Sequence, residues 1–147
     1  MKRLPFIIIV LILGAACAST RPIVPLRDLL GVTVDMSRDE VQTALSAVGE
    51  KQRDERKRQE VWTLRDDASY EGAIVGYTPE WKVRFITLVA RADGKPVQFA
   101  DVLDVAQATH KSAGSTHTYR WHPAGASYDI VATGTDRVQY LTLTNEN

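Results

Sequence analysis

Cysteine is almost absent from this chain of 147 residues, in which Cys17 is the single one. A disulfide within the chain is therefore excluded. Because Cys17 directly follows an N-terminal apolar segment, a Cys-His nucleophile in the folded part is excluded as well. The chain also lacks a Gly-x-Ser-x-Gly elbow and has only three histidines. We predict that the protein is not an enzyme and has no catalytic residue.

An excess of charge of one sign is lacking too. Lys plus Arg and Asp plus Glu number 18 each, and the chain without its first 16 residues has 16 basic against 18 acidic residues, a net charge of −2. Nucleic acid is thus not an expected partner. With 44% hydrophobic and 24% charged residues, the composition is that of a folded globular protein, and the length suits one domain.

The N-terminal apolar run is too short to span a membrane. It extends from Leu4 to Ala16, about 13 residues, whereas a spanning helix needs roughly 20. Lys2 and Arg3 precede it and small residues end it. This pattern predicts a signal peptide over residues 1–16.

The segment Leu13-Gly14-Ala15-Ala16-Cys17 resembles the lipobox of bacterial lipoproteins. The resemblance implies that Cys17 becomes the first mature residue and carries acyl chains such as palmitate, with residues 17–25 as a lipidated tether. In Gram-negative lipoproteins an aspartate after the cysteine is the exception to transport to the outer membrane. Ala18 stands at this position, so the resemblance implies that the protein is anchored in the outer membrane and faces the periplasm. The alternative is ordinary cleavage after Ala18, which would release a soluble secreted protein that begins at Ser19.

A helix is predicted to start at Ser37, since Ser37 and Glu40 have the spacing of a capping box. The apolar spacing from Val41 to Val48 is helical, and Gly49 follows as a C-terminal cap. Residues 50–60 contain no apolar side chain, so we expect a solvated loop that adds nothing to the core.

Strand signals dominate the rest of the chain. The segment 99–109 is compatible with a second helix capped by Asp101, and a hairpin opened by Asp93-Gly94 is the alternative. The predicted strands are residues 61–64, 70–77, 81–91, 116–122, 127–133 and 137–144.

Two passages of the chain are similar to each other. Residues 68–71 (Ala-Ser-Tyr-Glu) recur as residues 126–129 (Ala-Ser-Tyr-Asp), and the strand at 83–88 recurs at 138–143. We predict a single α+β domain over residues 26–147, with a helix packed on an antiparallel β-meander. It would consist of two tandem helix-plus-three-strand repeats, at about 29–94 and 95–147.

The leader, the helix start from Asp35 to Val41 and the meander together resemble the SmpA/OmlA (BamE-like) family of small outer-membrane lipoproteins. The doubled unit is similar to β-lactamase inhibitory protein. Members of both act by binding other proteins. The resemblance implies a cell-envelope lipoprotein that serves as a non-catalytic structural or protein-interaction module with an envelope protein as its partner. Asp35 stands where the family usually has glycine.

Tyr77 and Trp81 are the candidate protein-binding residues, because aromatic side chains dominate interface hot spots and both lie at the Thr78-Pro79-Glu80 turn. Two alternatives stay open: an inhibitor of a periplasmic hydrolase that presents this turn, and a small-ligand or lipid carrier. His117 and His122 are expected on opposite faces of a strand, which argues against a shared zinc ion. We predict no metal and no cofactor.

Overall fold

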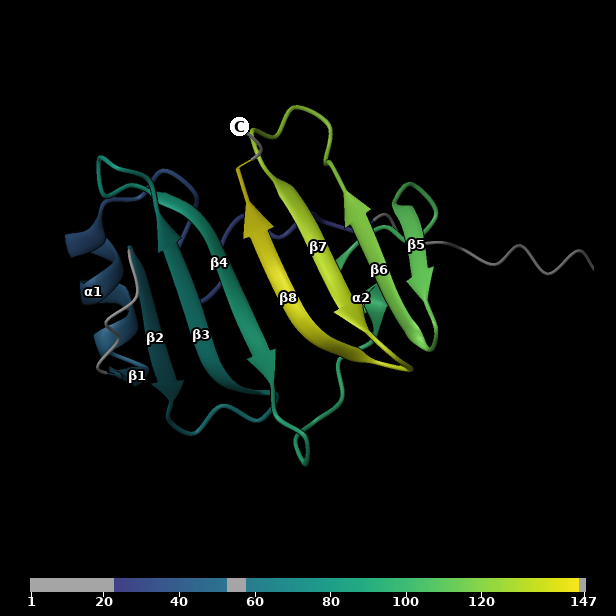
Figure 1. The fold of residues 1–147 in the computed structure, drawn as a ribbon, viewed down its shortest axis with the longest axis horizontal. Helices are drawn as coiled ribbons and strands as arrows, with labels where there is room; N and C mark the ends of the chain where they lie inside the picture. The colour runs from purple at the N-terminus through teal and green to yellow at the C-terminus, as the bar shows by residue number, and fades with distance from the viewer. Residues whose placement is uncertain (1–22, 53–57, 146–147) are drawn as a thin grey trace, which may run out of the picture.

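The computed structural model describes residues 23–52 and 58–145, which form one antiparallel sheet with two short helices. In this part of the chain eight strands lie in the order β1-β2-β3-β4-β8-β7-β6-β5 (Figure 1). The elements are α1 (Arg38–Ser46), β1 (Gly49–Lys51), β2 (Gln59–Leu64), β3 (Tyr70–Tyr77), β4 (Val83–Ala90), α2 (Phe99–Val102), β5 (Thr109–Ala113), β6 (Thr116–Trp121), β7 (Asp129–Gly134) and β8 (Val138–Thr144). The predicted signal peptide and Cys17 lie outside the described residues. Within the described ranges, no helix is both long and apolar enough to cross a membrane.

The predicted fold class, a helix packed on a meander in two helix-plus-three-strand repeats, is wrong. The sheet dominates, because α1 has nine residues and α2 only four, and each half of the described chain contributes one helix and four strands. We missed β1, which lies in the run expected to be a loop, and β5, whose residues are all exposed. Both are edge strands that pair with a single neighbour. An edge strand without a buried face lacks the apolar alternation by which a strand is predicted.

The first helix begins where the sequence predicts. The Glu40 carboxylate accepts a hydrogen bond from the backbone N–H of Ser37 at 2.8 Å, and Val41 and Leu45 are fully buried. Its end differs from the prediction: Ala47 is the C-cap, and Gly49 is the first residue of β1. A side chain at Gly49 would meet the carbonyl oxygen of Thr63 on β2 at 2.6 Å, so glycine allows this close pairing.

The second helix is much shorter than the predicted 99–109. Gln98 is its N-cap and Asp101, expected to be the cap, instead accepts a hydrogen bond from the Gln98 N–H at 2.9 Å. The helix stops because Leu103 adopts an extended conformation and is fully buried. Asp104 then forms a turn by accepting the N–H of Ala106 at 3.0 Å, and the chain enters β5.

The two halves of the sheet meet at β4 and β8. Across this junction Ile86 pairs with Leu143, Thr87 with Thr142 and Leu88 with Leu141. Since Thr87 and Thr142 also occupy equivalent positions in the two similar sequence passages, a local two-fold axis passes through this pair. Their hydroxyl oxygens are hydrogen-bonded at 2.8 Å.

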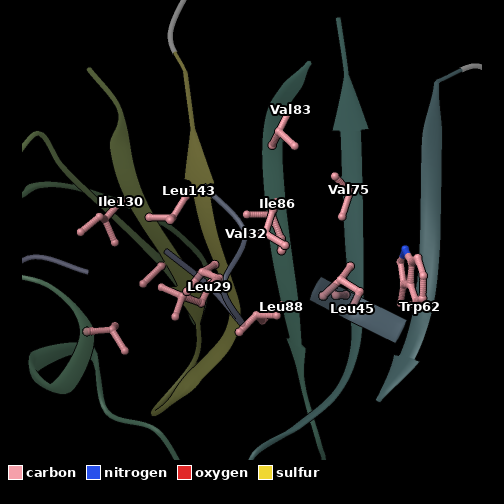
Figure 2. Close-up of a cluster of buried hydrophobic side chains, with 14 of the residues drawn as sticks. Leu29, Val32, Leu45, Trp62, Val75, Val83, Ile86, Leu88, Ile130 and Leu143 are labelled. Atoms are coloured by element: carbon pink, nitrogen blue, oxygen red, sulfur yellow. The ribbon is translucent and has the colours of Figure 1, made fainter. Parts of the chain in front are cut away.

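One face of the sheet holds the core. The segment from Ile23 to Asp35 runs behind β7, β8 and β4, α2 lies behind the second half of the sheet, and α1 lies at the left edge next to β1 and β2 (Figure 1). Leu29 and Val32 of this segment are buried against the strands. Val41 and Leu45 of α1 belong to the same core. Figure 2 shows the layer that successive strands build; its members include Trp62, Val75, Ile86, Leu143 and Ile130.

The opposite face is turned to the viewer in Figure 1, and neither of the two helices of the described residues covers it. The strand register aligns half-buried apolar and threonine side chains across it, and they are Val61, Ile74, Thr87, Thr142 and Val131. This face will be called the open face.

Candidate protein-binding site

The turn between β3 and β4 carries Trp81, one of the two predicted contact residues. The N–H of Trp81 donates to the carbonyl of Thr78 at 3.0 Å, and the N–H of Thr78 donates to the carbonyl of Lys82 at 2.8 Å. Trp81 has a φ of +59° and is 42% exposed. A bulky residue in the left-handed region is uncommon and persists where the surrounding structure holds it.

The N-terminus of α1 holds this turn in place. The N–H of Arg38 donates to the carbonyl of Trp81 at 3.1 Å, and Ser37 forms a β-bridge with Lys82. The Arg38 guanidinium lies 4.6 Å from the centre of the Trp81 ring. This geometry gives a cation–π contact, so both the backbone and the indole of Trp81 are bound to the helix start.

A buried carboxylate, Glu60 on β2, positions the Arg38 side chain. Glu60 is only 4% exposed and accepts a hydrogen bond from Arg38 Nε at 2.7 Å. Gln42 Nε2 and the Tyr77 hydroxyl donate to it at 3.1 and 3.0 Å, and Lys51 Nζ lies 3.6 Å away. The prediction that residues 50–60 add nothing to the core is wrong at this position.

The environment of Glu60 keeps it ionised. Burial by itself raises the pKa of this carboxyl, but hydrogen bonds from Arg38, Gln42 and Tyr77 and the charge of Lys51 outweigh burial and leave the pKa below its ordinary value. A buried charge without such partners would be strongly unfavourable. Glu60 therefore anchors the Arg38 guanidinium as one half of an ion pair.

Tyr77, the other predicted contact residue, lies beneath the surface. It is 3% exposed, and its ring centre is 5.7 Å from that of Trp81. Burial, then the charge of Glu60 and the hydrogen bond to it, raise the pKa of the Tyr77 hydroxyl, so the group stays protonated and donates to the carboxylate. Tyr77 supports Trp81 from below and does not itself reach a partner.

The cluster thus presents an exposed indole beside a cation whose position is fixed from within. We call the indole of Trp81 and the guanidinium of Arg38 the Trp81–Arg38 surface. Aromatic and arginine side chains of this kind are the ones that carry most of the binding energy at protein interfaces. The arrangement is suited to recognition.

Arg38 and Glu60 are not among the contact residues predicted from the sequence. Glu60, Trp62 and Leu64 are buried in alternation along β2, so Glu60 follows the period-2 pattern that marks the covered face of a strand. That pattern was readable from the sequence, and it would have singled out Glu60 as a carboxylate in need of a partner.

Asp67 and the His122–Asp129 pair lie apart from this cluster. Asp67 accepts the N–H groups of Ser69 and Tyr70 at 2.8 and 2.7 Å, which is turn chemistry. His122 is paired with Asp129, Nδ1 to Oδ1 at 2.7 Å. Among residues 23–52 and 58–145, no three His, Cys, Asp or Glu side chains gather as a metal site.

Comparison of the chain with protein-family models, with curated proteins and with solved structures found no match in any of the three. The resemblance to the SmpA/OmlA family therefore stays a prediction made on the leader, the helix start and the strand pattern that follows.

Proposed function

We propose that this chain is a lipid-anchored protein of the bacterial cell envelope that binds another protein, without catalysing a reaction, through the Trp81–Arg38 surface. The observation that carries the proposal is the position of Trp81. Its side chain lies at a turn, the residue is 42% exposed, and Arg38 contacts both its backbone carbonyl and its ring. A side chain that is ordered before binding, as the Trp81 indole is, loses little conformational entropy when a partner covers it.

The location in the envelope is supported by the sequence. The basic start, the apolar run of residues 4–16 and the lipobox-like segment that ends at Cys17 favour export and acylation. Several acyl chains on one residue give a stable membrane anchor.

Site-specific photo-crosslinking in the native cell tests the interaction. A photoreactive residue replaces Lys82, which is exposed next to Trp81, and in a parallel experiment it replaces Lys111 on the far edge strand β5. We expect a discrete crosslinked product from position 82 only. Equal products from both positions, or none from position 82, would contradict the proposal. A product whose partner is a hydrolase that loses activity on binding would identify the chain as an inhibitor.

Substitution of the indole gives the quantitative form of this test. Trp81→Asn removes the ring and keeps a residue that tolerates a positive φ, and Tyr140→Ala removes another exposed aromatic side chain, on β8 and 47% exposed. Loss of a hot-spot aromatic costs about 2 kcal/mol, or about thirtyfold in Kd. We expect this weakening for Trp81→Asn toward the crosslinked partner and an unchanged Kd for Tyr140→Ala, while circular dichroism shows both variants folded.

Intact-mass analysis of the membrane fraction tests the predicted lipid on Cys17 separately. We expect a chain cleaved before Cys17 with acyl chains attached, and loss of this mass in Cys17→Ser. A soluble chain that begins at Ser19 would contradict the anchor.

A further inference from the structure

The β5–β6 hairpin brings together two histidines that are seven positions apart. His110 lies on β5 and His117 on β6, at the sheet edge opposite α1 (Figure 1). The register pairs His110 with Tyr119 and Ser112 with His117, so the two imidazoles are diagonal neighbours on the same face. Nε2 of His110 and Nδ1 of His117 are 3.1 Å apart.

The rings of this pair are held by a row of aromatic contacts. His110 stacks on Tyr119 with ring centres 4.4 Å apart and planes inclined by 14°, and it stacks on His117 at 5.2 Å and 24°. Phe99 of α2 also contacts the Tyr119 ring, with ring centres 4.9 Å apart and planes inclined by 52°. Stacking limits the rotation of both imidazoles and keeps their facing nitrogens close together. His110 is nonetheless exposed, so the pair is accessible from solvent.

We propose that His110 and His117 form a two-histidine site for a divalent transition-metal ion. Metal–nitrogen bonds of about 2.0–2.1 Å place two ligand nitrogens about 2.8–3.4 Å apart for bond angles between about 90° and 109°. The observed 3.1 Å falls within this interval. Imidazole nitrogens prefer Zn²⁺, Ni²⁺ and Cu²⁺, whereas Mg²⁺ and Ca²⁺ prefer oxygen ligands.

Binding needs both facing nitrogens free of protons. When both imidazoles are neutral, the ring that donates the hydrogen bond carries its proton on the facing nitrogen. On metal binding this ring changes tautomer, so that its proton moves to its own outward nitrogen. Each imidazole then keeps one proton, and no net proton is released. Two protein ligands leave coordination positions for water. The ion is therefore exchangeable, unlike the ion of a closed structural site.

Titration calorimetry with ZnCl₂ on the full chain carrying Cys17→Ser tests this site, because the substitution removes the one competing thiol and the test then does not depend on lipidation or on a partner. All three histidines of the chain can be tested one at a time. His110→Phe keeps a ring to stack on Tyr119, His117→Asn keeps a polar side chain, and His122→Ala serves as the control, since His122 pairs with Asp129.

We expect binding of one Zn²⁺ per chain, weakened at least about tenfold by His110→Phe and by His117→Asn and unchanged by His122→Ala. A Zn²⁺-dependent rise in Tm should disappear in the same two variants. Absence of Zn²⁺ binding to the parent chain, or equal weakening by all three substitutions, would overturn the proposal. MgCl₂ should produce no binding signal, and a signal equal to that of Zn²⁺ would also contradict it.

Discussion

The two halves of the sheet have the same strand order but use their buried carboxylates differently. In the first half Glu60 faces the core under α1 and fixes Arg38 beside Trp81. In the second half Asp129 lies on the other face from Ile130 and pairs with Arg120 at 2.9 Å and His122 at 2.7 Å.

The difference between the halves follows from the lengths of their helices. The nine residues of α1 bring Arg38 and Gln42, one turn apart, onto the same carboxylate, whereas the four residues of α2 have no second turn. The two halves therefore share their strand topology and differ in the length of the helix that covers each of them.

The largest expected effect tests whether both halves share one core. Leu45 in α1 and Leu103 at the end of α2 are both fully buried. Leu45→Ala and Leu103→Ala should each lower the free energy of unfolding by about 3 kcal/mol, because burial and the remaining cavity determine the cost, whatever the helix length. Urea unfolding measures both. A cost below about 1 kcal/mol for Leu103→Ala would show that the core of the second half contributes much less to the free energy of unfolding than the core of the first half.

A second prediction concerns the carboxylate of the first half. Glu60→Gln should cost about 2 kcal/mol at neutral pH, because it removes the charged acceptor of three hydrogen bonds. The folded-state pKa of Glu60 is below its ordinary value, so its contribution is fully present above the ordinary pKa and disappears as the pH falls through the depressed one. The stability difference between parent and variant should accordingly be constant well above pH 4.5, the ordinary pKa of this carboxyl, and narrow as the pH falls below it.

Glu50 provides the matched control for this experiment. It is an acid on the neighbouring strand, paired with Arg65 at 3.2 Å, with its side chain 72% exposed. Glu50→Gln should change stability by less than about 0.5 kcal/mol. A loss as large as that of Glu60→Gln would mean that burial does not distinguish the two carboxylates.

An effect smaller than that of Glu60→Gln is expected on the two-fold axis, where the halves are equivalent. Thr87→Val and Thr142→Val each remove one hydroxyl of the same hydrogen bond on the open face. Each should cost about 0.5–1 kcal/mol, and the two costs should agree, which thermal unfolding of both variants can measure. Unequal costs would show that the junction is asymmetric in energy despite its symmetric pairing.

The central strands and the start of α1 were predictable because their signals are local. Residues 70–77 form a strand as predicted, since apolar and β-branched side chains recur there within a few positions. The helix start at Ser37 needs only Glu40, three residues away. The strand β5 and the early end of α2 were missed, because the first has no buried side chain and the second depends on burial of Leu103.

By itself the sequence determined the leader pattern, the start of the first helix and the strand-rich character of the rest, because each is encoded in a short window of neighbouring residues. Only the tertiary structure decided that Arg38 is the partner of Glu60, that Thr87 meets Thr142 on an axis, and that the imidazoles of His110 and His117 face each other. These contacts depend on strand register. Register is set by the packing of the whole sheet, and a shift of a single residue would turn each side chain to the other face.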